Sequence, residues 1–246
     1  MTTLLLSSRF TEDNQGLWRA AVNLGWNVER VRGVTVPEGL ADPEIVIYVE
    51  SLFAPTIADS LGLTLIDPPD DWLVRLPSEY RQRDLRLTTL GDARRLTEPK
   101  FIKPPNEKSF EAKVYRSGIE LPVEFDDSTA VLIAEPVTFE IEYRCFVLNR
   151  MVRTMSPYLR GGQLAKASGF SSPEGEAAEA REYASRLMAD QSVGFPQAVV
   201  LDIGKIANRG WAAVELNGAW GSGIYGCVPS AALEVIRHAV VRKASS

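Results

Sequence analysis

The chain has 246 residues, of which 45% are hydrophobic and 24% are charged, a balance typical of a globular protein that buries its own core. Its formal net charge of −5 argues against a sequence-independent grip on nucleic acid, which needs a basic surface. Apolar runs fall short of the roughly 20 residues of a membrane span, and the first residues lack the features of a signal peptide. We therefore expect a cytoplasmic protein that binds neither nucleic acid nor a membrane. The sequence leaves its oligomeric state open.

Residues for nucleophilic and zinc chemistry are scarce in this chain. The two cysteines, Cys145 and Cys227, lack the paired spacing of a zinc site. The single histidine, His238, lies in an amphipathic segment near the C-terminus, where a surface position is expected. This composition argues against Ser-His-Asp, Cys-His and multi-histidine metal chemistry.

Residues 1–76 alternate strand and helix patterns. Their expected strands lie at 4–6, 45–49 and 63–66, and their expected helices at 17–24 and 55–61. This alternation is typical of a small α/β domain with a mainly parallel sheet, and we place its boundary at residue 76.

Residues 77–246 have a different texture, because antiparallel strand patterns dominate there. The charged segment 79–95 is predicted to be a linking helix, and an apolar stripe predicts a second helix at about 176–191. The expected strands lie at 101–104, 110–115, 130–137, 143–148, 151–155, 198–203 and 211–216.

Two apolar strands near the C-terminus carry three oxygen-bearing side chains. The turn residues 208–210 lie between these strands, so a hairpin is predicted. Side chains alternate faces along a strand, so Glu215 and Asn217 point the same way, and the opposed strand can bring Asp202 beside them. Two carboxylates and a carboxamide oxygen suit Mg²⁺. The alternative is that the three residues are polar neighbours of a turn and share no ligand.

Several lysines are candidate phosphate ligands. Lys103 stands in an apolar strand that ends at two prolines, and a lysine among buried residues needs an anionic partner, which phosphate would supply. Lys113 on the facing strand is predicted to reach the same cavity, and Lys108 lies on the turn between them. For each lysine the alternative is a solvent-facing position on a strand.

The strand that ends at Glu135-Pro136-Val137 is a candidate adenine contact. Where it becomes irregular, its backbone groups are free to pair with an adenine edge. Just downstream, Glu142 and Arg144 share a face by period two. A carboxylate can accept ribose hydroxyls, and an arginine can bind phosphate oxygens. This cluster is equally compatible with a surface salt-bridge ladder.

These candidate residues come in the order Lys103, Glu135–Val137, Glu142–Arg144, Asp202 and Glu215–Asn217. In this order the chain resembles the ATP-grasp ligases. In its pattern of strands and charged residues it resembles the clade of that superfamily that is named for its arginines and lysine. The resemblance covers about residues 77–240. It implies an α+β and α/β architecture in which an ATP-grasp fold of antiparallel sheets and helices follows a small α/β N-terminal domain.

The resemblance also implies roles for individual residues. Lys103 would contact nucleotide phosphate and adenine, and Glu135 and Val137 would form the adenine hinge, with Lys113 in the same nucleotide site. Glu142 would hold ribose, and Arg144 would contact the phosphates or an acyl phosphate, so the catalytic residues would be Lys103 and Arg144. Asp202, Glu215 and Asn217 would hold Mg²⁺.

Two parts of the family pattern are less regular in this sequence. The clade's upstream arginine corresponds best to Arg83, with Arg81 and Arg86 as competitors. Residues 105–109 replace the glycine-rich phosphate loop of other ATP-grasp enzymes, so closure over the γ-phosphate would fall to Lys108 or Lys166.

The implied activity is an ATP- and Mg²⁺-dependent carboxylate–amine ligase that acts through an acyl phosphate on small-molecule or peptide substrates. Loops 160–172 and 220–227, which include Trp220 and Tyr225, are candidates for the acceptor pocket. The alternatives are an ATP-binding regulatory module without ligase chemistry and a small-molecule kinase. For the ligase, Asp202→Asn and Glu215→Gln are expected to abolish turnover with little loss of folding.

Overall fold

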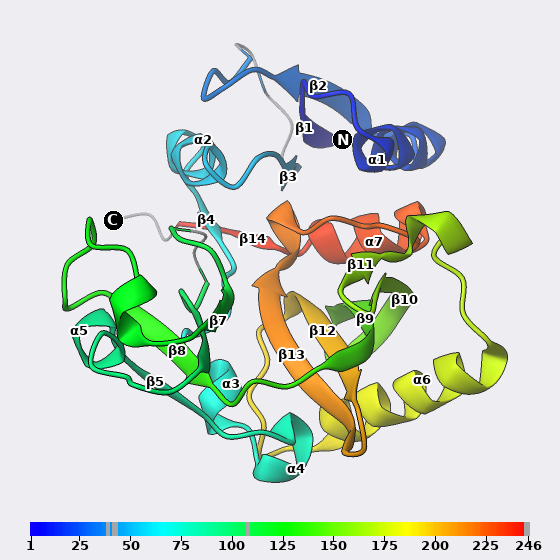
Figure 1. Ribbon diagram of the computed structural model, residues 1–246. Coiled ribbons are helices and arrows are strands. Elements are labelled where there is room, and N and C mark those ends of the chain that lie inside the picture. Colours follow the sequence, from blue (N-terminus) through cyan, green and yellow to red (C-terminus); the bar gives the residue numbers. More distant parts are fainter. Residues whose placement is uncertain (38–39, 41–43, 107–108, 244–246) are drawn as a thin grey trace.

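The computed structural model describes residues 1–37, 40, 44–106 and 109–243. Its N-terminal unit, by which we mean the described part of residues 1–76, contains a three-stranded parallel sheet in the order β2-β1-β3 (Figure 1). Its elements are β1 (Thr2–Ser7), α1 (Glu12–Asn23), β2 (Asn27–Val31), β3 (Glu44–Tyr48), α2 (Ala54–Ser60), β4 (Leu63–Leu65) and α3 (Trp72–Arg75). The parallel sheet agrees with the expectation from sequence, although β2 was not predicted because its pattern is mostly polar and exposed.

Strand β4 is present where the sequence predicts it, but it does not join the parallel sheet. It pairs antiparallel with β14 (Val240–Arg242), close to the other end of the chain. The N-terminal unit and the C-terminal segment are thereby joined by backbone hydrogen bonds.

The predicted linking helix at 79–95 is wrong. The segment forms α4 (Ser78–Arg81), β5 (Leu85–Thr89) and α5 (Leu90–Ala93). Leu85 and Leu87 lie two positions apart, and both contact the core from one face of a strand. This period of two was missed in the sequence, because Leu90 and Ala93 together with the two leucines also fit a helical pattern.

Two antiparallel sheets follow, and the space between them holds the candidate site. The four-stranded sheet has the order β5-β8-β6-β7, and the five-stranded sheet has the order β11-β10-β9-β12-β13 (Figure 1). Their remaining strands are β6 (Lys100–Lys103), β7 (Lys113–Tyr115), β8 (Ala130–Ala134), β9 (Phe139–Leu148), β10 (Met151–Arg160), β11 (Gln163–Leu164), β12 (Ala198–Ile206) and β13 (Gly210–Gly218). Three 3₁₀ turns lie at Gly118–Glu120, Ala165–Ser168 and Ala219–Gly221.

Helix α6 (Glu174–Ala189) covers one face of the five-stranded sheet, as its predicted apolar stripe requires. Tyr183, Ala184 and Leu187 pack there against Tyr143 and Leu201. The alternate residues of the same strands point to the opposite face, which is therefore left for other partners.

Helix α7 (Pro229–Ile236) packs on part of that opposite face. One buried cluster joins Leu233 and Ile236 of α7 to Phe146 and Val200 of the sheet and to Leu4 of the N-terminal sheet. The N-terminal unit and the C-terminal helix thus share one core. The division of the chain at residue 76 stays a prediction. None of the helices in the described ranges is both long and apolar enough to cross a bilayer.

Candidate nucleotide and metal site

The hairpin of β12 and β13 brings the three candidate metal ligands together. Asp202 lies directly opposite Glu215, and Asn217 lies opposite Val200, so all three side chains share one face of the sheet. The side-chain amide of Asn217 donates hydrogen bonds to Glu215 Oε1 (3.0 Å) and Asp202 Oδ2 (3.4 Å). The turn depends on Asn208 and Gly210, which have φ angles of 62° and 91°.

Asp202 is fully buried and pairs with Arg144 on the neighbouring strand. The guanidinium donates from Nε (2.9 Å) and Nη2 (2.5 Å) to the two carboxylate oxygens, and from Nη1 to the carbonyl of Gly223 (3.2 Å). Burial raises the pKa of Asp202 to about 6, Arg144 opposes this rise, and the nearby charge of Glu215 adds to it. The pair places a cation and a carboxylate together at the base of the site.

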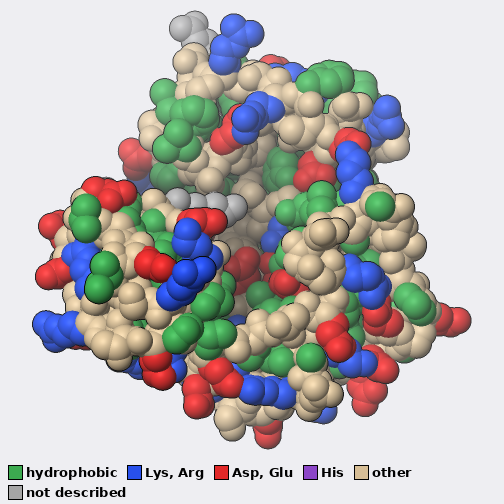
Figure 2. Space-filling view, in the orientation of Figure 1, with side chains coloured by type: hydrophobic (Ala, Val, Ile, Leu, Met, Phe, Trp, Pro, Cys, Tyr) green, Lys and Arg blue, Asp and Glu red, His purple; other side chains and the backbone are tan. Residues whose placement is uncertain are grey.

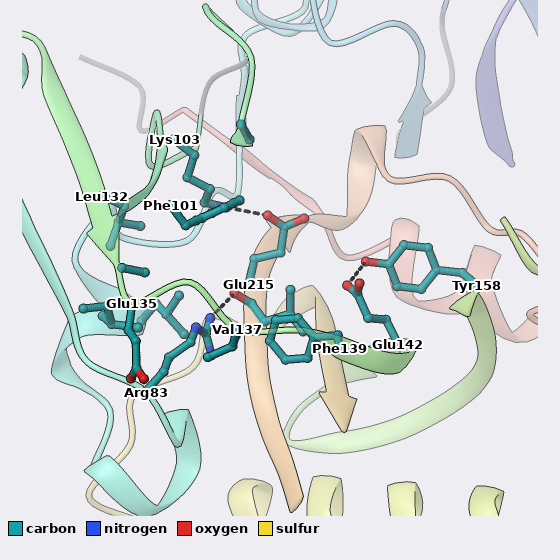
Figure 3. Close-up of a pocket in the computed structure, with 15 residues that line it drawn as sticks. Arg83, Phe101, Lys103, Leu132, Glu135, Val137, Phe139, Glu142, Tyr158 and Glu215 are labelled. Carbon is teal, nitrogen blue, oxygen red and sulfur yellow. Dashed lines mark hydrogen bonds and ion pairs between the residues drawn. The ribbon is translucent and has the colours of Figure 1, made fainter. Parts of the chain in front are cut away.

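Glu215 pairs with Lys103 of the other sheet. Lys103 Nζ lies 2.5 Å from Glu215 Oε2, and their side chains are 13% and 30% exposed (Figure 3). Burial acts against ionisation of Glu215, but Lys103 and Asn217 outweigh it and lower its pKa to about 2. The carboxylate is therefore ionised at neutral pH, and this ion pair bridges the two sheets.

The donor set fits a small, hard cation. Among the described residues, no group of three or more Asp, Glu, His or Cys side chains is placed to hold a metal ion, so a site here would need the Asn217 amide oxygen as its third ligand. A half-turn of its amide exchanges nitrogen for oxygen and would present an acceptor beside the two carboxylates. Mg²⁺ takes few protein oxygens and completes its shell with water and phosphate, so Asp202, Glu215 and Asn217 suffice.

A cavity of about 250 Å³ lies between the two sheets beside this cluster. Its walls are largely apolar, and the charged side chains of Arg83, Lys103 and Glu142 reach it from different sides (Figure 3). The cavity is lined by Leu73, Arg83, Leu85, Phe101, Lys103, Ala112, Leu132, Ala134, Glu135, Val137, Phe139, Glu142, Tyr158, Val214 and Glu215. Figure 2 shows a hollow near the centre of the molecule, with acidic side chains inside it.

A second cavity of about 480 Å³ adjoins the first. Both are lined by Lys103, Ala112 and Glu215, and the second also reaches Asn217 and Phe110. The Lys103–Glu215 pair therefore stands where the two cavities meet, with space on both sides.

Glu142 and Arg83 place opposite charges in the first cavity. Burial, with the charges of Asp202 and Glu215, raises the pKa of Glu142 to about 7, although its carboxylate accepts a hydrogen bond from the Tyr158 hydroxyl (2.9 Å). Burial lowers the pKa of Arg83 to about 10.

Arg83 is oriented by the backbone rather than by an acid. It donates to the carbonyls of Arg81 (2.9 Å), Ala213 (2.8 Å) and Val214 (3.3 Å) and lies over the Phe139 ring.

Comparison with known families shows the family to which the chain belongs. The model of family 2 of the ATP-grasp clade named for its arginines and lysine matches residues 80–235, which is more than half of the chain. The chain belongs to this family. The resemblance inferred from sequence is thereby confirmed, and ATP and Mg²⁺ are the cofactors that ATP-grasp enzymes use. A search of curated proteins found no match.

Solved structures confirm the ATP-grasp fold. N5-carboxyaminoimidazole synthetase from Staphylococcus aureus is 12% identical with a TM-score of 0.59, over 96% of this chain and 77% of that one. The D-cycloserine synthetase DcsG is 11% identical (TM-score 0.56; 96% and 98% covered). D-alanine–D-alanine ligase from Bacillus anthracis, complexed with ATP, is 10% identical (TM-score 0.53; 96% of each covered). At these identities the likeness concerns the fold.

Two predicted nucleotide ligands, Lys113 and Glu135, are each paired with a charged side chain of the protein. Lys113 lies opposite Ile102, which faces the small core on the far side of its sheet, and it pairs with Glu111 (2.6 Å). The carboxylate of Glu135 lines the cavity edge, but Arg209 binds it through two hydrogen bonds of 2.5 and 2.9 Å, and its pKa falls to about 2. This placement gives Lys113 no support as a nucleotide ligand.

The other candidate nucleotide-binding residues differ in whether they line the cavity. Val137 lines the cavity, and within the described part of the chain its backbone groups take no hydrogen bond, so they are available to an adenine edge. Of the three candidate arginines, only Arg83 lines the cavity. Lys108 lies outside the described residues, and Lys166 pairs with Glu12 (2.8 Å).

Several residues of the site were not found from sequence. Tyr158 follows Pro157 at a β-bulge, where the pairing of β10 with β9 shifts by one residue. The sequence signal for this bulge is the proline inside a strand pattern. Phe139 forms a wall of the cavity, and Gly204 makes room for it, because a Cβ there would lie 2.5 Å from the Phe139 ring. Tyr225, noted only as a possible slot residue, lies 5.0 Å over Arg144.

Proposed function

We propose that this ATP-grasp protein is a carboxylate–amine ligase that uses ATP and Mg²⁺ and activates its carboxylate substrate as an acyl phosphate. The observation that supports this most strongly is the convergence of Asp202, Glu215 and Asn217 beside Lys103, at the junction of the two cavities.

The first cavity suits a nucleoside. Phe101 and Leu132 from one sheet and Phe139 from the other offer flat, apolar contact to a purine, and Val137 offers free backbone groups at the edge. Glu142 would accept hydrogen bonds from the ribose hydroxyls in its ionised form, because both oxygens of a carboxylate are acceptors.

The charged residues suit the phosphate end. Bound Mg²⁺ would polarise the transferred phosphoryl group and neutralise its charge. Lys103 would exchange Glu215 for phosphate, which frees the Glu215 carboxylate for the cation. Arg144 keeps Asp202 ionised and still has N–H groups to offer, since two of its five are bonded to Asp202 and one to Gly223.

Nothing covalent is required of the protein in this proposal. Its side chains would hold the reactants together and stabilise the developing charge, and one well-placed donor of this kind contributes on the order of 3 kcal/mol. No histidine is among the described residues that line either cavity, which is consistent with such a mechanism.

The test is ADP release by the purified protein with ATP, Mg²⁺ and panels of amino acids and short peptides, with hydroxylamine added as a trap. A ligase that forms an acyl phosphate yields a hydroxamate with the trap and an amide with the proper amine, both visible by mass spectrometry. A stable phosphorylated product would instead make the protein a kinase. Binding of ATP without ADP release across the panels would make it a regulatory module.

A further inference from the structure

The residues that follow Asn217 run along the N-terminal unit and are held there at alternate positions. We refer to residues 218–225 as the 218–225 segment. Three side chains of the N-terminal unit bind it. The hydrogen bonds run from Trp220 Nε1 to Asp67 Oδ1 (3.0 Å), from the Tyr48 hydroxyl to the Ser222 carbonyl (3.1 Å), and from the Ile224 backbone N–H to Asp13 Oδ2 (2.9 Å).

The far end of this segment carries Tyr225, whose backbone is in the left-handed region with φ 48°. A tyrosine adopts that conformation only where its surroundings impose it. The bond from Ile224 to Asp13 fixes the preceding residue, and the Cys227 N–H closes a turn onto the Ile224 carbonyl (2.9 Å). The Tyr225 ring is thereby held 5.3 Å from the Tyr158 ring.

The segment touches Arg144 at two points. The Tyr225 ring centroid lies 5.0 Å from the guanidinium carbon, and the Gly223 carbonyl accepts a hydrogen bond from Nη1 (3.2 Å). Its near end begins directly after Asn217, a candidate metal ligand. Any displacement of the segment therefore acts on two predicted members of the reactive cluster together.

Asp13 is a rigid anchor for this purpose. It lies in the first turn of α1, which is capped by Thr11, and the Asn14 side chain fixes that turn to the Arg9 carbonyl (2.7 Å). A Cβ at Gly223 would lie only 3.3 Å from Asp13 Oδ2, so the carboxylate and the segment are in close contact.

We propose that Asp13, together with Tyr48 and Asp67, positions the 218–225 segment so that Arg144 and Asn217 keep the orientation that the ligase reaction needs. The inference rests on the proposed function. None of the three side chains lines the nucleotide cavity, so they are positioning residues. The N-terminal unit would thus contribute to catalysis through hydrogen bonds to one segment.

The first experiment compares Asp13→Ala with Asp13→Asn. Asparagine keeps an acceptor oxygen for the Ile224 N–H, whereas alanine removes it. In the ADP-release assay, Asp13→Ala is expected to lower kcat about tenfold or more with the KM for ATP changed less than about twofold, because the nucleotide cavity is untouched. Asp13→Asn should stay within about threefold of wild type. Asp59→Ala, which removes an exposed carboxylate of the same unit, is the matched control.

The second experiment needs no substrate, so it separates failure of this inference from failure of the proposed function. Hydrogen exchange of the Ile224 amide should accelerate about tenfold in Asp13→Ala and remain unchanged in Asp13→Asn and Asp59→Ala. If Asp13→Ala does not fold, Tyr48→Phe removes a single hydroxyl and should accelerate exchange and lower kcat in the same direction.

Unchanged exchange at Ile224 in Asp13→Ala would overturn the inference, whether or not the protein proves to be a ligase. So would a kcat for Asp13→Ala equal to that of Asp59→Ala. Equal impairment of Asp13→Asn and Asp13→Ala would also overturn it, because the charge of Asp13, and not its hydrogen bond, would then carry the effect.

Discussion

Glu215 links the two sheets at the candidate site, since it binds Lys103 (2.5 Å) and Asn217 (3.0 Å) and borders both cavities. Glu215→Gln keeps the shape of the side chain and removes its charge. We expect it to abolish Mg²⁺-dependent ADP release and also to lower the melting temperature, because Lys103, whose side chain is only 13% exposed, loses its counter-charge. Glu179→Gln, at an exposed carboxylate on α6, is the control. Full turnover of Glu215→Gln would refute its role at the metal.

Asp202 behaves differently from what the sequence alone suggested. Its carboxylate is fully buried against Arg144, so Asp202→Asn leaves a buried guanidinium without its counter-charge. We now expect Asp202→Asn to lose turnover and also about 3 kcal/mol of stability, measured by urea unfolding. A variant with the unfolding midpoint of wild type would contradict this assignment of the ion pair.

Glu142 gives the protein a pH-dependent stability. Its pKa is raised from 4.5 to about 7, mainly by burial, so ionisation destabilises the folded state. The stability that the neutral Glu142 carboxyl group gives to the folded state is fully present below pH 4.5 and is lost as the pH rises through 7. Without nucleotide, Glu142→Gln should gain about 2 kcal/mol over wild type between about pH 5 and about pH 8. Parallel stability curves for the two proteins would show that Glu142 has an ordinary pKa.

For single residues, prediction from the sequence succeeded where the alternation of side chains along a strand decides which face a residue occupies. The strand period and the hairpin turn place Asp202, Glu215 and Asn217 on one face. It gives no sign of distant partners such as Arg209, which binds the Glu135 carboxylate from 74 positions away. It failed at Tyr158, whose direction is set by a bulge.

Among the secondary-structure elements, β9 can pack closely against β12 because one residue of β12 is a glycine. Gly204 lies opposite Glu142, and a Cβ there would lie 2.5 Å from the Phe139 ring and 3.1 Å from Glu142 Cγ. Gly204→Ala should therefore push both side chains into the nucleotide cavity and weaken ATP binding about tenfold by calorimetry, with a stability loss of about 1–3 kcal/mol. Gly194→Ala, where a Cβ meets nothing within 4 Å, is the control. Wild-type affinity in Gly204→Ala would show that these side chains do not border the bound nucleotide.

Element prediction succeeded for the hairpins and α6 and failed for residues 79–95. Their helical spacing is real, but it arises from two short elements in sequence, β5 and α5, whose apolar residues face different cores. Local pattern cannot reveal that β8 offers β5 a pairing partner some 45 residues later, because strand pairing is a tertiary interaction.

At the scale of the whole molecule, the N-terminal unit shares its core with α7. Removal of residues 1–76 would expose Leu233 and Ile236 and break the pairing of β14 with β4. We expect residues 77–246 alone to lack a cooperative thermal transition, as followed by circular dichroism. A sharp melt within about 5 °C of the full chain would show instead that the two parts fold independently.

The central claim is that the space between the two sheets holds ATP with Mg²⁺ on Asp202, Glu215 and Asn217. The most direct measurement is a crystal structure with Mg²⁺ and a non-hydrolysable ATP analogue. We expect adenine against Val137, phosphates beside Lys103 and the metal on the three oxygens. A nucleotide bound elsewhere, or a metal that touches none of the three side chains, would contradict it.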